Sequence, residues 1–220
     1  MSRKGVLLVN LGSPDSTEVA DVRRYLREFL SDPRVLDIPP LVRAIVLYLF
    51  ILPFRPKESA EAYEKIWTED GSPLIDITEG VADKLRARID PVVEIAMRYG
   101  NPSTESGLRA LADKDVDEVF VIPLYPHYAM SSYETAVAKV TDELDALPFE
   151  MDLTFQPPFY DDEAYLDALE ASSREYLEGD YDHVVFSYHG VPVRQVTKRD
   201  PTQCHCLQTR DCCSKESPAH

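Results

Sequence analysis

The sequence has no excess of basic residues. Its 23 lysines and arginines stand against 39 aspartates and glutamates, which gives a net charge of −16 at pH 7 and a pI near 4.7. Without a basic stripe to neutralise phosphates, nucleic acid is not an expected partner. The same charge disfavours broad electrostatic adhesion to anionic lipid, while a local apolar contact stays compatible with it.

Cysteine is absent from the first 203 residues. All four cysteines fall within the next ten positions: Cys204, Cys206, Cys212 and Cys213. A disulfide scaffold would spread its cysteines along the chain, so this cluster is typical of a cytosolic thiol segment. The opening "MSRKGVLLVNLG" has too brief an apolar run for a secretory signal and no cleavage site. We therefore expect a cytoplasmic protein.

Long apolar runs are also missing. The segment "PPLVRAIVLYLFILPF" (39–54) has one charge, Arg43, and roughly 14 apolar residues, whereas a membrane-spanning helix needs about 20. Two interpretations remain open: a buried helix, or an exposed apolar lip that guards a site for a flat, greasy ligand or dips into a membrane interface through residues 41–54. Arg55 and Lys57 follow directly. An apolar wall followed by cations suits a ligand with an apolar body and carboxylate tails.

The rest of the chain alternates between two kinds of segment, and its 220 residues suit one domain or one domain plus the start of another. Apolar runs with strand character occupy 5–12, 92–100, 117–126 and 183–190, with a weaker fifth at 151–159. Between them apolar residues recur at helical spacing, as in "STEVADVRRYLREFLSD", where Ser16 is the expected N-cap. This alternation predicts an α/β fold: a doubly wound parallel sheet covered by helices on both faces.

Polar and aromatic side chains follow four of the predicted strands. In sheets of this kind ligands bind outside the carboxyl ends of the strands. Any one such residue is more often structural, but four strands that end in this way favour a site at this edge. The residues are Asn10, Leu11, Gly12, Arg98, Tyr99, Asn101, Tyr125, His127, Tyr128, Tyr188 and His189.

Five strings, collinear and correctly spaced, resemble the ferrochelatase family, whose members insert ferrous iron into a porphyrin at the end of haem synthesis. They are "NLGSP", "YEKIWTEDGSPL", "MRYGNPS", "IPLYPHYAMSS" and "FSYHGVP". The resemblance runs from "VLLVNLGSPDS" to about residue 203, and segment 39–54 resembles the family's substrate-mouth segment. It implies a chelatase-like fold in which residues 1–200 form the first of two similar α/β halves. Residues 201–220 would then be a cysteine-rich connection leading toward a second half.

The resemblance makes His189 the principal candidate for contact with the iron or for pyrrole deprotonation. Neutral imidazole suits either task, as a base with an unperturbed pKa near 6.5 or as an iron ligand. His127 ranks lower as an iron contact, because only some family members have histidine there. The resemblance places the contacts with the porphyrin and its propionates at Leu11, Arg55, Tyr63, Ser72, Arg98, Tyr125 and Ser131.

The chemistry needs more than one imidazole. Iron insertion removes two pyrrole protons and strips the hydration shell of the ion, and a rigid pocket that favours a distorted macrocycle lowers the barrier. Family members carry a glutamate opposite the histidine in the second half, so we expect a chain without that half to lack full activity. The alternative is a non-catalytic tetrapyrrole- or metal-cluster-binding half-domain. A cobalt or nickel chelatase is a further rival, disfavoured by the lip and the "GSPL" string.

The cysteine segment "CHCLQTRDCC" lacks the paired spacing of a zinc ribbon. Because some ferrochelatases hold a [2Fe–2S] cluster on four cysteines, the resemblance implies Cys204, Cys206, Cys212 and Cys213 as its ligands. Adjacent Cys212 and Cys213 are awkward for one small cluster, since neighbouring side chains diverge. Zinc or a merely reactive loop therefore stay open, with His205 and His220 as substitute ligands.

Overall fold

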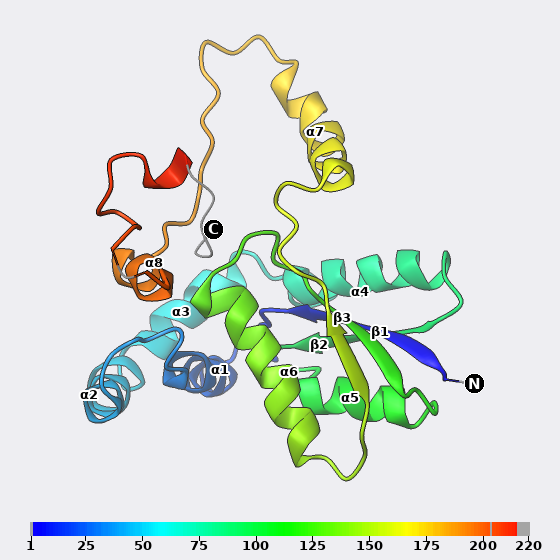
Figure 1. The fold of residues 1–220 in the computed structure, drawn as a ribbon. Coiled ribbons are helices and arrows are strands. Elements are labelled where there is room, and N and C mark those ends of the chain that lie inside the picture. The colour runs from blue at the N-terminus through cyan, green and yellow to red at the C-terminus, as the bar shows by residue number, and fades with distance from the viewer. Residues whose placement is uncertain (1, 203, 215–220) are drawn as a thin grey trace. The chain divides into compact units, whose positions relative to one another are not determined.

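The computed structural model of the protein describes residues 2–202 and 204–214 (Figure 1). The chain divides into two compact units, one of residues 1–125 and 130–157, the other of residues 126–129 and 158–220. The boundary between these units falls after Pro157; the domain limits that the sequence predicts, 1–200 and 201–220, stay a prediction. The His220 candidate and the last part of the 201–220 segment lie outside the described residues.

The first unit is built on a four-stranded parallel sheet in the order β2-β1-β3-β4. The two central strands pair in register from Lys4↔Glu118 to Val9↔Pro123. The strand order reverses between β1 and β3, which is the doubly wound arrangement. Four of the five predicted strands are confirmed: β1 (Lys4–Asn10), β2 (Val92–Met97), β3 (Glu118–Pro123) and β4 (Asp152–Phe155).

Helices cover both faces of this sheet (Figure 1). Successive side chains of a strand point to opposite faces, so Leu8 of β1 packs with Ala82 of α4 while Leu7 packs with Leu108 of α5 and Val140 of α6. All five side chains are buried. The predicted α/β fold, with a parallel sheet flanked by helices, is confirmed. The covering helices are α4 (Pro73–Arg86), α5 (Thr104–Ala112) and α6 (Thr135–Ala146).

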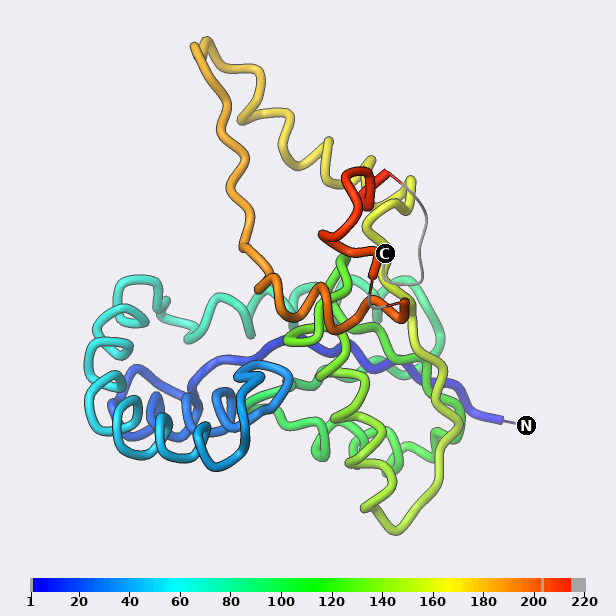
Figure 2. The backbone as a smooth tube through the Cα atoms, turned by 60° about the vertical axis from the view of Figure 1, so that its left-hand side comes forward, coloured from blue at the N-terminus to red at the C-terminus, as the bar shows by residue number. Residues whose placement is uncertain are grey.

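Three further elements gather around α1 (Val19–Ser31), as the blue and cyan part of Figure 2 shows. They are α2 (Pro40–Ile45), the π-helix η1 (Val46–Ile51) and α3 (Arg55–Glu64). The residue before α1 is Glu18, so the prediction of Ser16 as the N-cap is wrong. The Ser16 hydroxyl instead accepts a hydrogen bond from the Glu18 N–H (3.1 Å) and donates to the Asp21 carboxylate (2.6 Å), which shapes the loop before the helix.

Segment 39–54, called the lip below, has two anchors and a largely exposed apolar surface. Leu47 and Leu52 are buried, whereas Phe50 is 63% exposed. Of the two interpretations of the sequence, the structure therefore shows the exposed one. Among the described residues, no helix combines the length and apolar character needed to cross a bilayer. The exposed large side chains are Leu41, Val42, Ile45, Tyr48, Leu49, Phe50 and Phe54.

The second unit contains α7 (Glu163–Leu177), α8 (Val193–Arg199) and a short 3₁₀ turn, η3 (Cys212–Ser214). The prediction of a strand at 183–190 is wrong, because this segment runs as irregular chain with Val185 86% and Tyr188 81% exposed. An apolar strand forms only when a neighbour supplies backbone hydrogen bonds and a packed face. Among the described residues the sheet ends at β4, so residues 183–190 have no such neighbour.

Candidate functional site

The carboxyl end of β1 is tied to its neighbours through Asn10. Its side-chain amide donates to the Thr78 hydroxyl of α4 (2.9 Å), and its Oδ1 accepts from the Leu11 N–H (2.8 Å). Beyond the strands, the Arg98 N–H donates to the Asn10 carbonyl (2.7 Å) and the Tyr99 N–H to the Leu11 carbonyl (3.0 Å). Leu11, Arg98 and Tyr99 are therefore held side by side at one edge of the sheet.

Two glycines allow the loops at this edge to touch. A Cβ on Gly12 would lie 1.8 Å from the Tyr99 carbonyl oxygen, and one on Gly100 would lie 2.7 Å from the Ser13 carbonyl oxygen. Both glycines also have positive φ, +102° and +78°, which residues with a Cβ rarely adopt. The glycines of the "NLGSP" and "MRYGNPS" strings therefore serve the mutual approach of the two loops.

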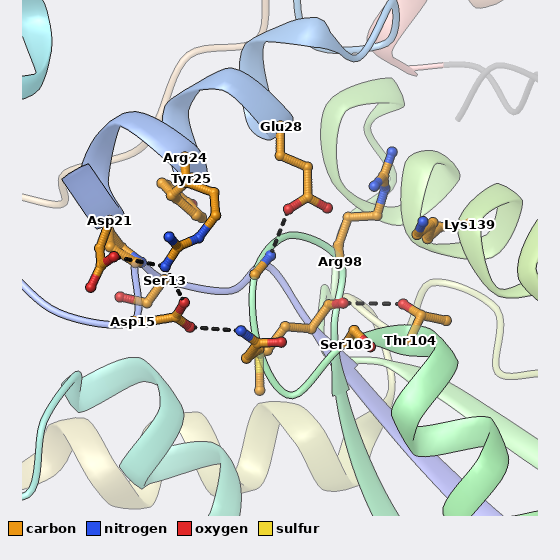
Figure 3. Close-up of a pocket in the computed structure, with 14 residues that line it drawn as sticks. Ser13, Asp15, Asp21, Arg24, Tyr25, Glu28, Arg98, Ser103, Thr104 and Lys139 are labelled. Atoms are coloured by element: carbon orange, nitrogen blue, oxygen red, sulfur yellow. Dashed lines mark hydrogen bonds and ion pairs between the residues drawn. The ribbon is translucent and has the colours of Figure 1, made fainter.

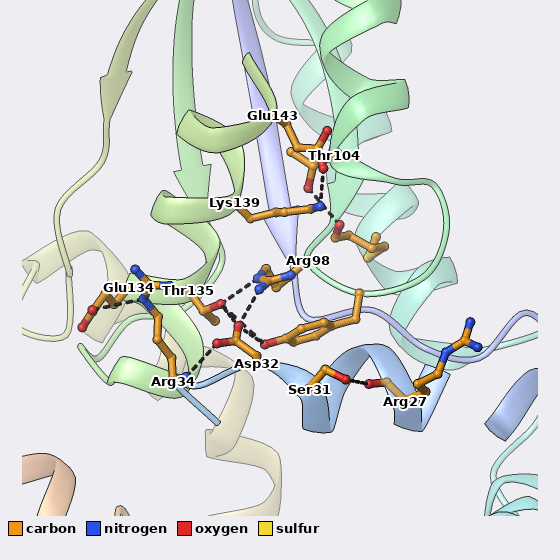
Figure 4. Close-up of polar contacts among 12 residues, drawn as sticks. Arg27, Ser31, Asp32, Arg34, Arg98, Thr104, Glu134, Thr135, Lys139 and Glu143 are labelled. Carbon is orange, nitrogen blue, oxygen red and sulfur yellow. Dashed lines mark hydrogen bonds and ion pairs between the residues drawn. The ribbon is translucent and has the colours of Figure 1, made fainter. Parts of the chain in front are cut away.

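A buried polar network fixes Arg98 (Figure 4). Arg98 Nη2 donates to Asp32 Oδ2 at 2.5 Å and Arg98 Nε donates to the Thr135 hydroxyl at 2.6 Å. The Tyr99 hydroxyl donates to the same Asp32 oxygen at 2.8 Å, and so does the Thr135 hydroxyl. The Arg34 N–H serves the other carboxylate oxygen at 2.7 Å. A single carboxylate thus orients the Arg98 guanidinium and the Tyr99 ring together.

Burial and hydrogen bonding shift the pKa of the Asp32 carboxyl in opposite directions. Burial raises it, but the hydrogen bonds from Thr135, the Arg34 N–H and Tyr99, with the positive charge of Arg98, outweigh burial and leave the pKa below its ordinary value. Asp32 is therefore an ionised, paired carboxylate in the folded state.

Four tyrosines cluster beside this network. The Tyr25 ring meets Tyr63 edge-on with 6.4 Å between centroids, and the Tyr25 hydroxyl donates to the Gly12 carbonyl (3.3 Å). Burial raises the pKa of Tyr25, Tyr63, Tyr99 and Tyr125, so all four stay neutral phenols. The Tyr125 hydroxyl is buried without a hydrogen-bond partner in the described part of the chain. Leaving such a group unpaired costs about 1–3 kcal/mol.

A pocket of about 250 Å³ opens between α1, the Ser13–Asp15 loop and the start of α5 (Figure 3). Several of its charged groups have partners in its own wall: Arg24 contacts Asp15 and Asp21 at 2.7 Å each, and Glu28 accepts from the Gly100 N–H at 3.0 Å. Arg98 and Asn101, both predicted at this edge from the sequence, line it. The lining residues are Ser13, Pro14, Asp15, Asp21, Arg24, Tyr25, Glu28, Met97, Arg98, Gly100, Asn101, Ser103, Thr104 and Lys139.

The predicted contact residues fall into two groups within the first unit. Leu11, Tyr63, Arg98 and Tyr125 belong to the edge with the tyrosine cluster. The other three lie at helix starts: Arg55 begins α3, exposed and 3.6 Å from Glu58; Ser72 is the buried residue before α4; Ser131 lies in the π-helix η2 (Met130–Glu134).

Both histidine candidates lie in the second unit. His127 is exposed and stacks on Tyr160 with 5.5 Å between ring centroids. His189 is exposed at the end of the irregular 183–190 segment, and its ring makes no hydrogen bond within residues 2–202 and 204–214. An exposed imidazole is open to a ligand and to exchange of protons with water.

The cysteine segment is organised by Asp200. Its carboxylate accepts from the N–H groups of Thr202, His205 and Cys206 at 2.7–2.9 Å. The Sγ atoms of Cys212 and Cys213 lie 3.7 Å apart, and all four thiols are free. In the described residues no three histidine, cysteine or acidic side chains converge as a metal site. This conformation therefore does not fit a [2Fe–2S] cluster bound by the four cysteines.

The sequence did not point to Asp32, Thr135 or Tyr25 as parts of the site. A buried arginine requires a carboxylate partner, so Arg98 at a strand end was a signal that such a partner exists. The sequence alone does not show which of its 39 acidic residues supplies this partner.

Fold and site together define an open, doubly wound α/β protein with polar and aromatic groups at the carboxyl edge of its sheet. The Ferrochelatase family model matches residues 3–220. The chain belongs to the ferrochelatase family.

Curated ferrochelatases of several bacteria are similar to this chain over all or nearly all of its length. A ferrochelatase of Opitutus terrae is 50% identical over 223 residues, which cover 100% of this chain and 65% of the relative. Ferrochelatases of Pseudomonas fluorescens SBW25 and Azotobacter vinelandii are 44% and 45% identical over 99% of this chain and 64% of their own length. The chain thus spans somewhat less than two thirds of the relatives it matches.

Proposed function

We propose that the protein acts as a ferrochelatase, inserting ferrous iron into a porphyrin in haem biosynthesis. The observation that carries this proposal is the family match over residues 3–220, together with relatives named ferrochelatase at up to 50% identity. Iron is the second substrate in this reaction, and protoporphyrin IX or coproporphyrin III is the first.

The porphyrin would be held by the carboxyl edge of the sheet. Aromatic faces at Tyr63 and Tyr125 suit a flat apolar macrocycle, and the buried, unpaired Tyr125 hydroxyl offers a polar group that a ligand could satisfy. Arg98 is pre-oriented by Asp32, so it loses little side-chain entropy on contact. Leu11, Ser72 and Ser131 complete the proposed contacts, with Arg55 at a propionate.

His189 is proposed as the group that touches the reacting centre. As a neutral imidazole it takes one pyrrole proton, or donates its ring nitrogen to the incoming iron in place of a water ligand. Its exposure in the structure supports rapid return of the proton to solvent. His127, stacked on Tyr160, is proposed as a secondary iron contact.

One finer proposal accompanies this function. The exposed lip residues 41–54 would give peripheral contact with the cytoplasmic face of the inner membrane, where an apolar face beside cations is favoured. A [2Fe–2S] cluster on the four cysteines is implied by the family resemblance alone, since the described conformation of these residues does not fit it, and no step of the reaction is routed through it. Absorbance spectra of anaerobically purified protein, with iron and sulfide analysis, test for it.

The test of the main proposal is His189→Ala in the protein extended to the length of its relatives. Iron insertion, followed anaerobically by the porphyrin absorbance bands, should fall by at least about 100-fold, as expected for loss of a general base. Porphyrin affinity, measured by fluorescence quenching, should stay within a few-fold. His183→Ala is the matched control, because His183 is also exposed in the second unit. Full turnover in His189→Ala would remove this residue from the mechanism.

A second candidate function, binding of a tetrapyrrole without turnover, is favoured by one observation. The His189 ring has no carboxylate partner in the described residues, and a lone imidazole cannot accept both pyrrole protons. The 220-residue chain should then bind protoporphyrin or coproporphyrin and leave the metal-free spectrum unchanged when Fe²⁺ is added. Metallation by this chain would exclude the second candidate.

A further inference from the structure

A groove of about 540 Å³ runs along α1 beside the lip, apart from the residues assigned to the porphyrin. On one side it is lined by Ala20, Arg23 and Arg27, which share a face of α1 because residues three and four apart are neighbours on a helix. On the other side lie Tyr48 and Leu52, four residues apart. α1 and η1 lie side by side in both views (Figures 1 and 2).

The groove carries positive charge that its surroundings do not cancel. Arg24, at its edge, is neutralised by Asp15 and Asp21 at 2.7 Å each. In contrast, Arg23 donates through Nε to the Leu52 carbonyl (3.3 Å), an uncharged partner. No carboxylate pairs with the Arg27 guanidinium within residues 2–202 and 204–214. Two guanidinium groups without a carboxylate partner among the described residues therefore line one side of this groove.

The location of these arginines indicates which class of anion would bind them. They lie next to the lip, where Tyr48, Leu49 and Phe50 are 55%, 62% and 63% exposed. A surface with apolar side chains beside cations matches the boundary between acyl chains and anionic headgroups in a bilayer. Guanidinium groups also bind phosphate in a forked geometry, and Tyr48 belongs to the residue type enriched at that boundary.

We propose that this groove binds the phosphate headgroup of an anionic phospholipid, through Arg23 and Arg27, when the lip contacts a membrane. The inference rests on the proposed membrane contact of the lip. It adds the class of lipid and the residues that bind its headgroup. The Arg23 bond to the Leu52 carbonyl couples the headgroup site to the lip anchor, so the cations and the apolar side chains reach the same surface.

The experiment compares vesicles of phosphatidylcholine with vesicles that also contain phosphatidylglycerol, by flotation of the full 220-residue chain. Arg23→Gln/Arg27→Gln should lower affinity for the anionic vesicles by roughly tenfold or more and leave the weak binding to neutral vesicles unchanged. Lys84→Gln/Arg88→Gln is the matched control, since both side chains are exposed and the charge change is equal. Melting curves verify that each variant folds.

Three outcomes would overturn the inference. If Leu49→Ser/Phe50→Ser abolishes vesicle binding while Arg23→Gln/Arg27→Gln does not, the membrane contact stands and the headgroup site is wrong. If the unaltered chain ignores both vesicle types, the membrane contact itself is wrong, whatever the outcome of the iron-insertion assay. If the two arginines bind inorganic phosphate in calorimetry but phosphatidylglycerol gives no gain, the site serves a soluble anion.

Discussion

Asp32 holds together more of the site than any other single side chain described above. Its carboxylate accepts from Arg98, Tyr99, Thr135 and the Arg34 N–H. Breaking a buried ion pair by removing one partner leaves an uncompensated charge, which typically costs 3–5 kcal/mol. The residue is thus a structural determinant of a site that it need not touch.

The first prediction concerns Asp32→Asn and its dependence on pH. The pKa of Asp32 is lowered in the folded state, so its contribution to stability is present above the ordinary carboxyl pKa and is lost as pH falls toward the folded value. At neutral pH the variant should lose about 3 kcal/mol of unfolding free energy. Below about pH 4 the difference should shrink, because the carboxyl of the unfolded chain then binds a proton, whereas the folded carboxyl with its lowered pKa binds one only at still lower pH. Urea unfolding at several pH values measures this.

Asp145→Asn serves as the control for that series. Asp145 is an exposed carboxylate of α6, and its removal should change the unfolding free energy by no more than about 0.5 kcal/mol at any pH. An equal loss for Asp32→Asn at neutral and acidic pH would contradict an ionised Asp32, and would indicate a packing effect instead.

At the scale of one element, the lip separates anchoring side chains from exposed ones. Leu47 is 1% exposed and Leu49 is 62% exposed, although they lie two residues apart in η1. Leu47→Ala should lower the unfolding free energy by about 2–5 kcal/mol, because a cavity remains. Leu49→Ala should change it by less than about 0.5 kcal/mol. Chemical denaturation of both variants tests this, and equal losses would mean that the lip is packed throughout.

The elements also show how far sequence patterns carry. Strands β1 to β4 were predictable because their apolar runs are bounded by charged or turn residues and alternate with amphipathic helices. The run at 183–190 also begins with apolar residues and forms no strand. A strand forms only beside a neighbouring strand that supplies its backbone hydrogen bonds. The pattern within one segment does not show whether that neighbouring strand is present. The same reason hides the Asp32–Arg98 pair, whose partners are 66 residues apart.

At the scale of the whole molecule, the core of the sheet is complete within the first unit. Both apolar clusters, from Val6 to Phe155, are contributed by residues before Pro157. A chain that ends at Pro157 should therefore unfold cooperatively, with a midpoint within a few degrees of that of the 220-residue chain. Thermal melts followed by circular dichroism test this. A chain that ends at Lys114, which lacks β3 and β4, should fail to fold, and a failure of the longer fragment as well would show that the second unit is required.

The strand order has a consequence for synthesis of the protein. β1 leaves the ribosome first but lies in the middle of the sheet, between β2, which begins at Val92, and β3, which begins at Glu118. Because synthesis adds roughly 5–20 residues per second, β1 stays without either neighbouring strand for seconds. The apolar lip has already emerged by then. The nascent chain therefore exposes the apolar lip before its sheet can form. Chaperone binding should be needed most while the residues between the lip and β3 are being synthesised.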